Sequence, residues 1–269
     1  MLDKNKNEFP ANLSKKDGKV IEKLGIKSKE ESDKILNDLG SAEYKVENIE
    51  KKEVKRNPFP PCTTSTLQQE AWKRLHYPAK LTMSIAQSLY EQGHITYHRT
   101  DSVNLAQAAV LQAKDFIESN YGKNYWAGYF RQYTSKGKTQ EAHEAIRPTQ
   151  ASNTPESLGL DDKQLKVYKI IWQRFVACQM AEAKFDATGV DIAAGDPVLG
   201  HTEGYTFRTN GQVLKFDGFL KIYPHKFEQT NLPELGVGDI LNLKKITPSQ
   251  HFTEPPARYN EASLIKALE

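Results

Sequence analysis

The sequence predicts an α+β chain with more than one domain, in which a helical domain is inserted between β-rich segments. Apolar residues recur at helical spacing between about residues 64 and 182, whereas β-prone runs lie on both sides of that region. Prolines at 58, 60 and 61 remove backbone donors and exclude a helix, so we place a domain boundary there. The predicted domains are a first β segment (1–58), a helical domain (59–182), a second β segment (183–247) and the truncated start of a further helical domain (248–269).

Composition and charge limit the class of protein. The 269 residues are 38% hydrophobic and 26% charged, and no run of 18 apolar residues predicts a membrane-spanning helix. The net charge of +3 neither indicates nor excludes nucleic acid, so any basic surface must be local. Cys62 and Cys178 fit no zinc spacing, and no apolar signal region follows Met1. These observations predict a cytoplasmic location.

The first 57 residues are charged and only weakly apolar. A short helix is predicted over 28–39, with Ser28 as its N-cap and Glu31 as the partner in a capping box. The Lys- and Glu-rich run from Tyr44 to Val54 is more typical of an exposed strand than of a helix.

From Thr64 onward the pattern predicts a helix, a turn at 76–78, a second helix from Leu81 and a short strand at 95–97. Helix, turn, helix and strand in this order are typical of a winged-helix DNA-binding module, although a small helical bundle fits the spacing equally well. Basic residues around the turn either grip a phosphate backbone or are simply solvated: Arg74, His76 and Lys80.

The remainder alternates between helices and strands. We predict helices over 104–121, over one turn at 141–146, from Asp161 or Asp162 to 182, and from residue 260. The aromatic stripe of the helix that begins near 161 is expected to be core. Strands are predicted over 185–193, 205–209, 212–216, 218–223 and 239–246, with Asn210-Gly211 as a hairpin turn.

The densest chemistry lies between Gly93 and Ser102, where a phenol, two imidazoles, a guanidinium and a carboxylate occur within ten residues. On a strand, Tyr97 and Arg99 point to the same side, because side chains alternate with period two. A phenol has a pKa of about 10 and needs a proton acceptor or positive charge nearby to act as a nucleophile. Arg99 supplies permanent positive charge in a fork that fits a phosphate.

Four blocks in this order resemble the signature motifs of type IA DNA topoisomerases, and of the bacterial enzymes in particular. The central block, ITYHRTDS at 95–102, resembles the active-site signature and follows Leu89-Tyr90-Glu91-x-Gly93. The others are TSTLQQEA at 64–71, EAHEAIRP at 141–148 and FTEPPARY at 252–259, the last followed by Glu261-Ala262-Ser263-Leu264. The resemblance covers about residues 64–269 and implies that the chain is the central fragment of a longer enzyme.

The resemblance implies cleavage and rejoining of one DNA strand through a 5′-phosphotyrosyl intermediate, relaxing negative supercoils without ATP. It assigns Tyr97 as the nucleophile, Arg99 as the phosphate ligand and His143 as a further phosphate contact. Partners would be single-stranded DNA, negatively supercoiled duplex and the remaining domains of the enzyme, with no membrane. The β segments would form part of an arch carrying the helical domain. The DNA-binding candidates are Arg99, His76, Lys80, Arg74 and Arg147, the last of which pairs equally well with Glu144.

The family also requires Mg²⁺ held by an Asp-x-Asp-x-Glu motif, and it carries zinc ribbons. Neither pattern is found in this sequence, so we predict no metal ligands in this chain and no activity for the chain alone.

Two other readings compete. A tyrosine recombinase would place its basic residues before the tyrosine, whereas His143 and Arg147 follow Tyr97. A non-enzymatic winged-helix DNA-binding module would need a basic recognition helix, but residues 81–92 contain no Lys or Arg.

Overall fold

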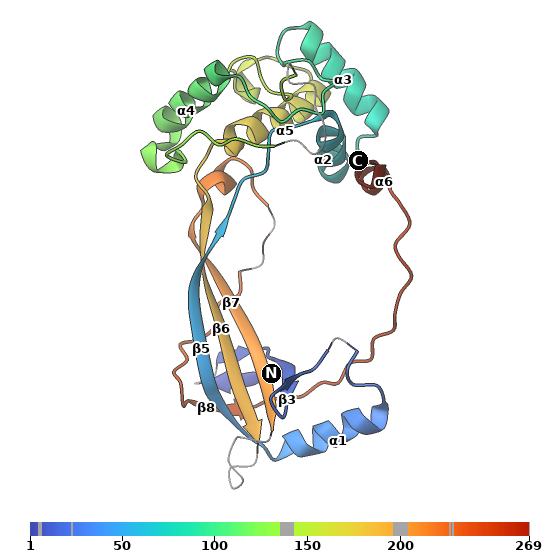
Figure 1. Ribbon diagram of the computed structural model, residues 1–269, viewed down its shortest axis with the longest axis vertical. Coiled ribbons are helices and arrows are strands. Elements are labelled where there is room, and N and C mark those ends of the chain that lie inside the picture. Colours follow the sequence, from blue (N-terminus) through green and yellow to red (C-terminus); the bar gives the residue numbers. More distant parts are fainter. Residues whose placement is uncertain are drawn as a thin grey trace. The chain divides into compact units, whose positions relative to one another are not determined.

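The computed structural model describes residues 1–4, 7–22, 24–134, 143–195, 204–225, 227 and 229–268. The chain divides into two compact units, each assembled from separate stretches of sequence (Figure 1). The sheet unit comprises Met1–Val54, Phe185–Lys215 and Phe227–Glu254. The helical unit comprises Lys55–Lys184, Phe216–Lys226 and Pro255–Glu269. The chain is thus of the α+β class and contains an antiparallel sheet, as predicted.

One eight-stranded sheet runs in the order β2-β1-β8-β5-β6-β7-β3-β4. Its pairs of described register are antiparallel, with Leu2 opposite both Phe9 and Leu243, and Tyr44 opposite Leu241. The predicted strands at 44–54, 185–193 and 239–246 are confirmed, whereas the four short strands before residue 21 were not predicted. The strands are β1 (Leu2–Lys4), β2 (Asn7–Phe9), β3 (Asn12–Lys16), β4 (Lys19–Val20), β5 (Glu43–Arg56), β6 (Ala183–Gly195), β7 (Tyr205–Phe216) and β8 (Ile240–Leu243).

Helix α1 (Lys29–Gly40) completes the core of the sheet unit. Ser28 is its N-cap, as predicted, and accepts a hydrogen bond from the Glu31 amide at 3.2 Å. The Glu31 carboxylate accepts from the Lys27 amide, one residue before the expected partner of a capping box. The helix buries Leu39 against the sheet, and the Leu39 carbonyl accepts from the Tyr44 hydroxyl.

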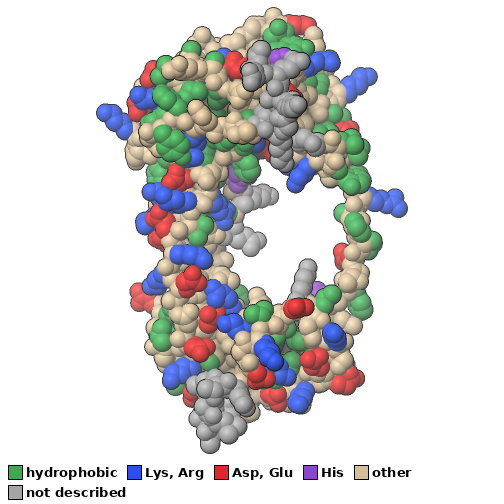
Figure 2. Space-filling view, viewed as in Figure 1, with side chains coloured by type: hydrophobic (Ala, Val, Ile, Leu, Met, Phe, Trp, Pro, Cys, Tyr) green, Lys and Arg blue, Asp and Glu red, His purple; other side chains and the backbone are tan. Residues whose placement is uncertain are grey.

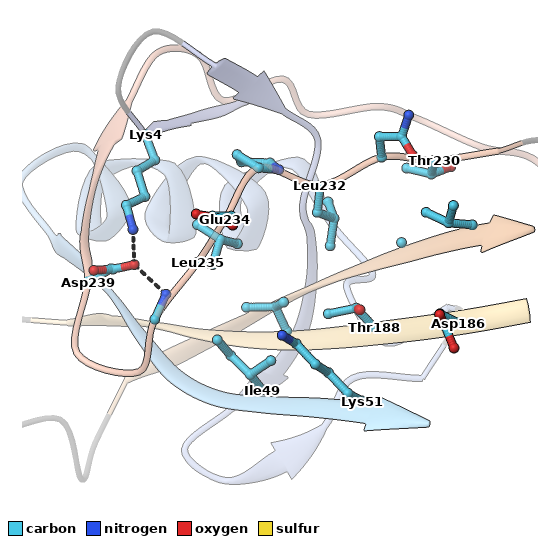
Figure 3. Close-up of a pocket in the computed structure, with 16 residues that line it drawn as sticks. Lys4, Ile49, Lys51, Asp186, Thr188, Thr230, Leu232, Glu234, Leu235 and Asp239 are labelled. Carbon is cyan, nitrogen blue, oxygen red and sulfur yellow. Dashed lines mark hydrogen bonds and ion pairs between the residues drawn. The ribbon is translucent and has the colours of Figure 1, made fainter. Parts of the chain in front are cut away.

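A segment after residue 229 passes over the sheet in Figure 3 and forms one wall of a cavity of about 480 Å³. Leu232 and Leu235 of this segment pack with Ile49 against the core of the sheet unit, and a Lys4–Asp239 ion pair lies at the rim.

Helix α5 lies at the centre of the helical unit. Tyr168, Trp172 and Phe175 of the predicted aromatic stripe are buried there, so the stripe is core. The helix ends at Cys178, earlier than predicted, and Met180 then forms a bridge with Trp126. Apart from the turn at 141–146, the other predicted helices are confirmed within a few residues. They are α2 (Thr64–Leu75), α3 (Ala79–Glu91), α4 (Gln107–Tyr121), α5 (Asp162–Cys178) and α6 (Glu261–Leu268).

Three predicted elements are wrong. The Asn210-Gly211 hairpin is absent, because β7 runs straight through both residues. The strand at 218–223 is instead a 3₁₀ helix, Gly218–Lys221. The strand at 95–97 is reduced to an isolated bridge between Ile95 and Pro148. The helical turn at 141–146 lies partly outside the described residues, and its described part is not helical.

No helix of the described residues combines the length and hydropathy needed to cross a bilayer.

Candidate active site around Tyr97

Backbone hydrogen bonds join three sequence blocks that are far apart in the chain. Thr64 binds the central block at three points: its amide donates to the Thr100 carbonyl, and its hydroxyl donates to the His98 carbonyl and accepts from the Thr100 amide, each at 2.9 Å. Residues 143–149 also bind the central block, because the Thr96 amide donates to the Arg147 carbonyl at 2.9 Å. Residues 64, 96–100 and 147 are therefore held in one rigid frame.

Further bonds tie the third block to its surroundings. The Thr96 hydroxyl donates to the Ala145 carbonyl at 2.7 Å, and the Ile146 amide donates to the Cys62 carbonyl at 2.8 Å. Ala145 in turn donates to the Asn104 carbonyl. Because backbone groups make these contacts, the frame does not depend on the mobility of long side chains.

The backbone of this frame presents Tyr97 and Arg99 together. The Tyr97 side chain is 48% exposed and Arg99 is exposed, whereas Ile95, His98 and Thr100 are buried. From Tyr97 to Thr100, exposed and buried positions thus alternate as expected even though no full strand forms, whereas the buried Ile95 does not follow this alternation. A phenol and a permanent cation consequently face solvent two residues apart, open to a phosphodiester.

Two aromatic rings support the Tyr97 ring from the side. The Tyr90 and Tyr97 ring centroids lie 5.4 Å apart at an interplanar angle of 71°, and those of His98 and Tyr97 lie 5.4 Å apart at 64°. Tyr90 also contacts His98 at 5.8 Å. Edge-to-face pairs of this kind contribute about 0.5–1.5 kcal/mol beyond burial and restrict the orientation of the phenol.

His98 is the least expected member of the site. Its side chain is 2% exposed, and neither ring nitrogen has a hydrogen-bond partner among the residues that the structure describes. Burial lowers the pKa of His98, and the neighbouring Arg99 lowers it further, while Glu91 acts in the opposite direction. The ring beside the phenol is therefore neutral at pH 7. Nothing in the sequence singled out His98 from its neighbours Tyr97 and Arg99.

The downstream block places its two predicted residues differently. His143 is exposed. Arg147 forms a bidentate pair with Glu144, with Nε–Oε1 at 2.6 Å and Nη2–Oε2 at 2.9 Å. Glu144 also accepts from the Ala106 amide at 2.7 Å, so this carboxylate fastens the start of α4 to the frame. Pairing with Glu144, one of the two predicted alternatives for Arg147, is the one seen.

The basic residues around the α2–α3 turn are also divided. His76 ends α2 in a left-handed conformation with φ of 55°, and both His76 and Lys80 are exposed. Arg74 turns inward instead, with Nε 3.0 Å from the Glu70 carboxylate and its guanidinium 4.1 Å from the centre of the Tyr223 ring. Two of the three therefore remain accessible to a phosphate backbone.

A second cluster with tyrosine, arginine and histidine lies within the helical unit and was not predicted. The Tyr223 hydroxyl donates to Glu70 at 2.5 Å and accepts from Arg174 at 3.1 Å, while Arg174 Nε donates to the Pro60 carbonyl at 2.6 Å. Burial raises the pKa of Tyr223, and the Glu70 carboxylate raises it further. His225 packs against the Tyr223 ring at 5.0 Å. Glu70 lies in the block at 64–71, but no motif marked Tyr223, Arg174 or His225, because they come from distant segments.

The block at 252–264 packs against the block at 64–71. Helix α6 packs against α2, and the Glu261 carboxylate accepts from the Ala79 amide at 2.7 Å. A carboxylate at this position satisfies a free amide at the start of α3 and complements the helix dipole.

The described residues do not fit a magnesium site. Among them, no group of three or more His, Cys, Asp or Glu side chains is arranged to hold a metal ion. Mg²⁺ prefers several carboxylate oxygens in octahedral geometry, and that set is not assembled around Tyr97 in the described part of the chain.

The sequence of the chain is similar to those of known proteins over most of its length. The model of a family described as DNA topoisomerase matches residues 5–269. The chain is 41% identical over 273 residues to DNA topoisomerase 1 of Haemophilus influenzae, covering 100% of this chain and 30% of that protein. It is 44% identical over 246 residues to DNA topoisomerase 1 of Escherichia coli, covering 90% of this chain and 28% of that protein.

A solved structure shares the fold. Full-length topoisomerase I from Thermotoga maritima matches with a TM-score of 0.72 and 29% identity, covering 96% of this chain and 41% of that one. The chain spans less than a third of the length of the two curated relatives named above. Because the family model matches almost every residue and a solved relative has the same fold, the chain belongs to the DNA topoisomerase family.

Proposed function

We propose that this chain carries the nucleophile of a type IA topoisomerase, which cuts one strand of DNA and rejoins it to relax negative supercoils. The observation that supports this most strongly is the frame built by residues 64, 96–100 and 147, which presents Tyr97 and Arg99 on one exposed side. Its substrates are single-stranded DNA and negatively supercoiled duplex in the bacterial cytoplasm.

In the proposed reaction, the Tyr97 oxygen attacks the phosphorus of a phosphodiester. The bond from phosphorus to the 3′ oxygen breaks, and the 5′ phosphate becomes joined to the phenol oxygen. The phenol proton passes to water, and the leaving 3′ oxygen takes up a proton. Attack by the 3′ hydroxyl later reverses these steps, so the ester keeps the bond energy and no nucleotide is consumed.

Arg99 and His143 supply positive charge and hydrogen bonds in this proposal. The Arg99 guanidinium is exposed beside Tyr97 and fits two phosphate oxygens, so it stabilises the charge that grows on them. His143 reaches a phosphate from the 143–149 block, which is bonded to Thr96. His76 and Lys80 grip the DNA backbone near the α2–α3 turn, with Arg74 and Arg147 as weaker candidates because each is paired with a carboxylate.

The fold is proposed to serve the binding of a DNA strand. Helices α2 and α3 with the following residues form a winged-helix-like module, and the helical domain is inserted between β segments that belong to an arch. Mg²⁺ would act in the longer enzyme through carboxylates outside this chain, where it would stabilise charge on the phosphate and leaving oxygen.

Trapping of a covalent protein–DNA adduct tests the function directly. The chain is mixed with the remaining part of the enzyme, Mg²⁺ and a labelled single strand, and is then denatured. We expect a labelled band with the wild-type chain and none with Tyr97→Phe. Tyr259→Phe, which alters a phenol that is 69% exposed elsewhere in the helical unit, is the matched control and should retain the band. An adduct that persists in Tyr97→Phe contradicts the proposal.

A plasmid relaxation assay tests the expected inactivity of the chain by itself. The described residues offer no carboxylate set for a metal and no evident acid for the leaving oxygen. Relaxation by the 269-residue chain with Mg²⁺, abolished in Tyr97→Phe, would show that these groups are not required.

A further inference from the structure

Two aromatic side chains of the helical unit are exposed side by side in the loop that follows α4. Tyr129 is 56% exposed and Phe130 is 46% exposed, and the ring of Phe130 contacts that of Trp126 with centroids 5.5 Å apart. Figure 2 shows apolar side chains of this unit exposed among charged ones. Single exposed apolar residues are ordinary, but three neighbouring rings in five residues form a surface that a ligand can cover.

The loop that carries these rings is firmly anchored. Arg131 Nε donates to the Met180 carbonyl at 3.2 Å and its backbone amide donates to the Gln179 side chain at 3.1 Å, while the Tyr133 hydroxyl donates to the Cys178 carbonyl at 2.7 Å. Residues 131 and 133 are thus bound to the end of α5, and residues 129 and 130 are held outward. A rigid platform loses little conformational freedom when a ligand binds, which favours affinity.

The charge around the rings is positive. Segments 55–57, 123–134 and 180–184, which contact one another here, carry five cations and one carboxylate: Lys55, Arg56, Lys123, Arg131 and Lys184 against Glu182. Glu182 is already paired with Lys55 and Arg131 at 3.1 Å each. Three further carboxylates near these segments are each paired: Asp217 accepts from the Tyr125 hydroxyl, and Glu53 and Asp186 both lie within ion-pair distance of Lys215. An anionic partner is therefore favoured over a neutral or acidic protein surface.

The Arg131 guanidinium also lies 5.1 Å from the centre of the Tyr129 ring. A cation behind a ring and further cations beside it match what single-stranded nucleic acid presents, namely flat bases joined by phosphates. Base stacking is tolerant of sequence, because every base has a π face.

We propose that Tyr129 and Phe130, backed by Trp126 and Arg131, form a base-stacking platform that binds single-stranded DNA outside the Tyr97 site. This inference rests on the proposed function, since it assigns the cleaved strand as the ligand. The platform holds bases of the strand, while Tyr97 and Arg99 engage one phosphate.

The test measures binding of the full 269-residue chain to a labelled thymidine oligonucleotide of about 20 nucleotides and to an abasic strand of equal length. We expect Tyr129→Ala and Phe130→Ala each to weaken binding of the thymidine strand by about tenfold. Binding of the abasic strand should not change, because it has no bases to stack. Val213→Ala, at an apolar position that is 43% exposed in the sheet unit, is the control and should bind like the wild type.

Each other outcome overturns a stated part. A wild-type chain that binds neither strand contradicts the proposed function and the platform together. A double variant Tyr129→Ala/Phe130→Ala that binds thymidine strands as tightly as wild type contradicts the platform alone. Equal losses of affinity for the thymidine strand and the abasic strand would contradict base stacking, because the abasic strand has no bases to stack. Loss of association with the remainder of the enzyme, with DNA binding unchanged, would assign the rings to a protein interface.

Discussion

Tyr97 and Tyr223 are two tyrosines of the helical unit that both lie near arginine and histidine, yet their surroundings are opposite. Tyr223 is fully buried, donates to Glu70 and accepts from Arg174. Tyr97 is 48% exposed, and its ring packs against the rings of Tyr90 and His98. Proximity to arginine is therefore common to both and does not identify a nucleophile.

The difference lies in what occupies the phenol oxygen. Burial and the Glu70 carboxylate raise the pKa of Tyr223, so its proton is retained and the hydroxyl serves as a structural bridge. The Tyr97 side chain faces solvent, where a phosphodiester can approach. Of the two tyrosines, Tyr97 is therefore the one we propose as the nucleophile, because its ring is held by aromatic contacts while its side chain remains accessible.

Removing each hydroxyl in turn is the strongest way to break the comparison. We expect Tyr97→Phe to abolish the covalent adduct formed by the reconstituted enzyme while leaving DNA binding nearly intact, because a single exposed hydroxyl is lost. Tyr223→Phe should still form the adduct at a temperature well below its unfolding transition. Adduct yield measured for both variants decides this, and loss of the adduct in Tyr223→Phe alone would reverse the assignment.

Replacing Arg99 should give the next largest effect. Arg99→Ala should lower the rate of strand cleavage by about 10²–10³, the usual loss when a donor to a developing anion is removed. Arg208→Ala, which removes an ion pair with Asp191 in the sheet unit, is the control and should leave the rate unchanged. Single-turnover cleavage by the reconstituted enzyme measures both, and equal rates in the two variants would contradict a role for Arg99 at the phosphate.

The free energy of unfolding should change more in Tyr223→Phe than in Tyr97→Phe, the opposite of their order in adduct formation. Tyr223→Phe removes one buried hydrogen bond from Glu70 and one from Arg174, which keep their contacts with Arg74 and the Pro60 carbonyl, so we expect a loss of about 1–3 kcal/mol in the free energy of unfolding. Tyr97→Phe removes an exposed hydroxyl and should change that value by less than about 0.5 kcal/mol. Urea unfolding followed by circular dichroism compares them, and similar losses would mean that the buried bridge contributes little.

The smallest expected effect concerns the pH dependence of stability through His98. Its folded pKa is lowered below the ordinary 6.5 by burial and by Arg99. As pH falls below 6.5, the unfolded chain takes up a proton that folded His98 resists, so stability decreases through this window and is unaffected well above it. His98→Met should reduce the difference in stability between about pH 7.5 and about pH 5.5.

His225 has the same direction of shift, because burial lowers its pKa too, so part of the acid sensitivity should remain in His98→Met. His143→Gln, which alters an exposed imidazole, is the control. A wild-type pH dependence in His98→Met would show that its ring is protonated equally in both states.

Local signals predicted the helices well. Ser28 before an apolar-periodic run placed α1, and Asp161 accepts from the amides at 163 and 164 to begin α5. Alternation also placed Tyr97 and Arg99 on one side, although only one bridge forms there. These features depend on neighbours within a few residues, which a sequence displays directly.

Features that depend on distant segments were missed. Gly211 is not a turn residue, because a Cβ there would lie 2.9 Å from Leu232 and 3.0 Å from the Thr230 carbonyl, so glycine admits a passing segment. Gly218, with φ of +49°, lies so close to the Ala181 and Glu182 carbonyls that a Cβ would be about 2.5 Å away. The Glu70–Tyr223 bridge joins residues 153 positions apart, and no local pattern announces it.

The Glu261 carboxylate that caps α3 has a consequence for the order in which the chain acquires its structure during synthesis. Ala79 and Glu261 are 182 positions apart, and α6 packs on α2 from the same late stretch of sequence. At a translation rate of about 5–20 residues per second, α2 and α3 leave the ribosome roughly 10–40 s before their last partner exists. During that interval the face of α2 that α6 later covers is open to solvent, and a chaperone that binds apolar helix faces has time to occupy it.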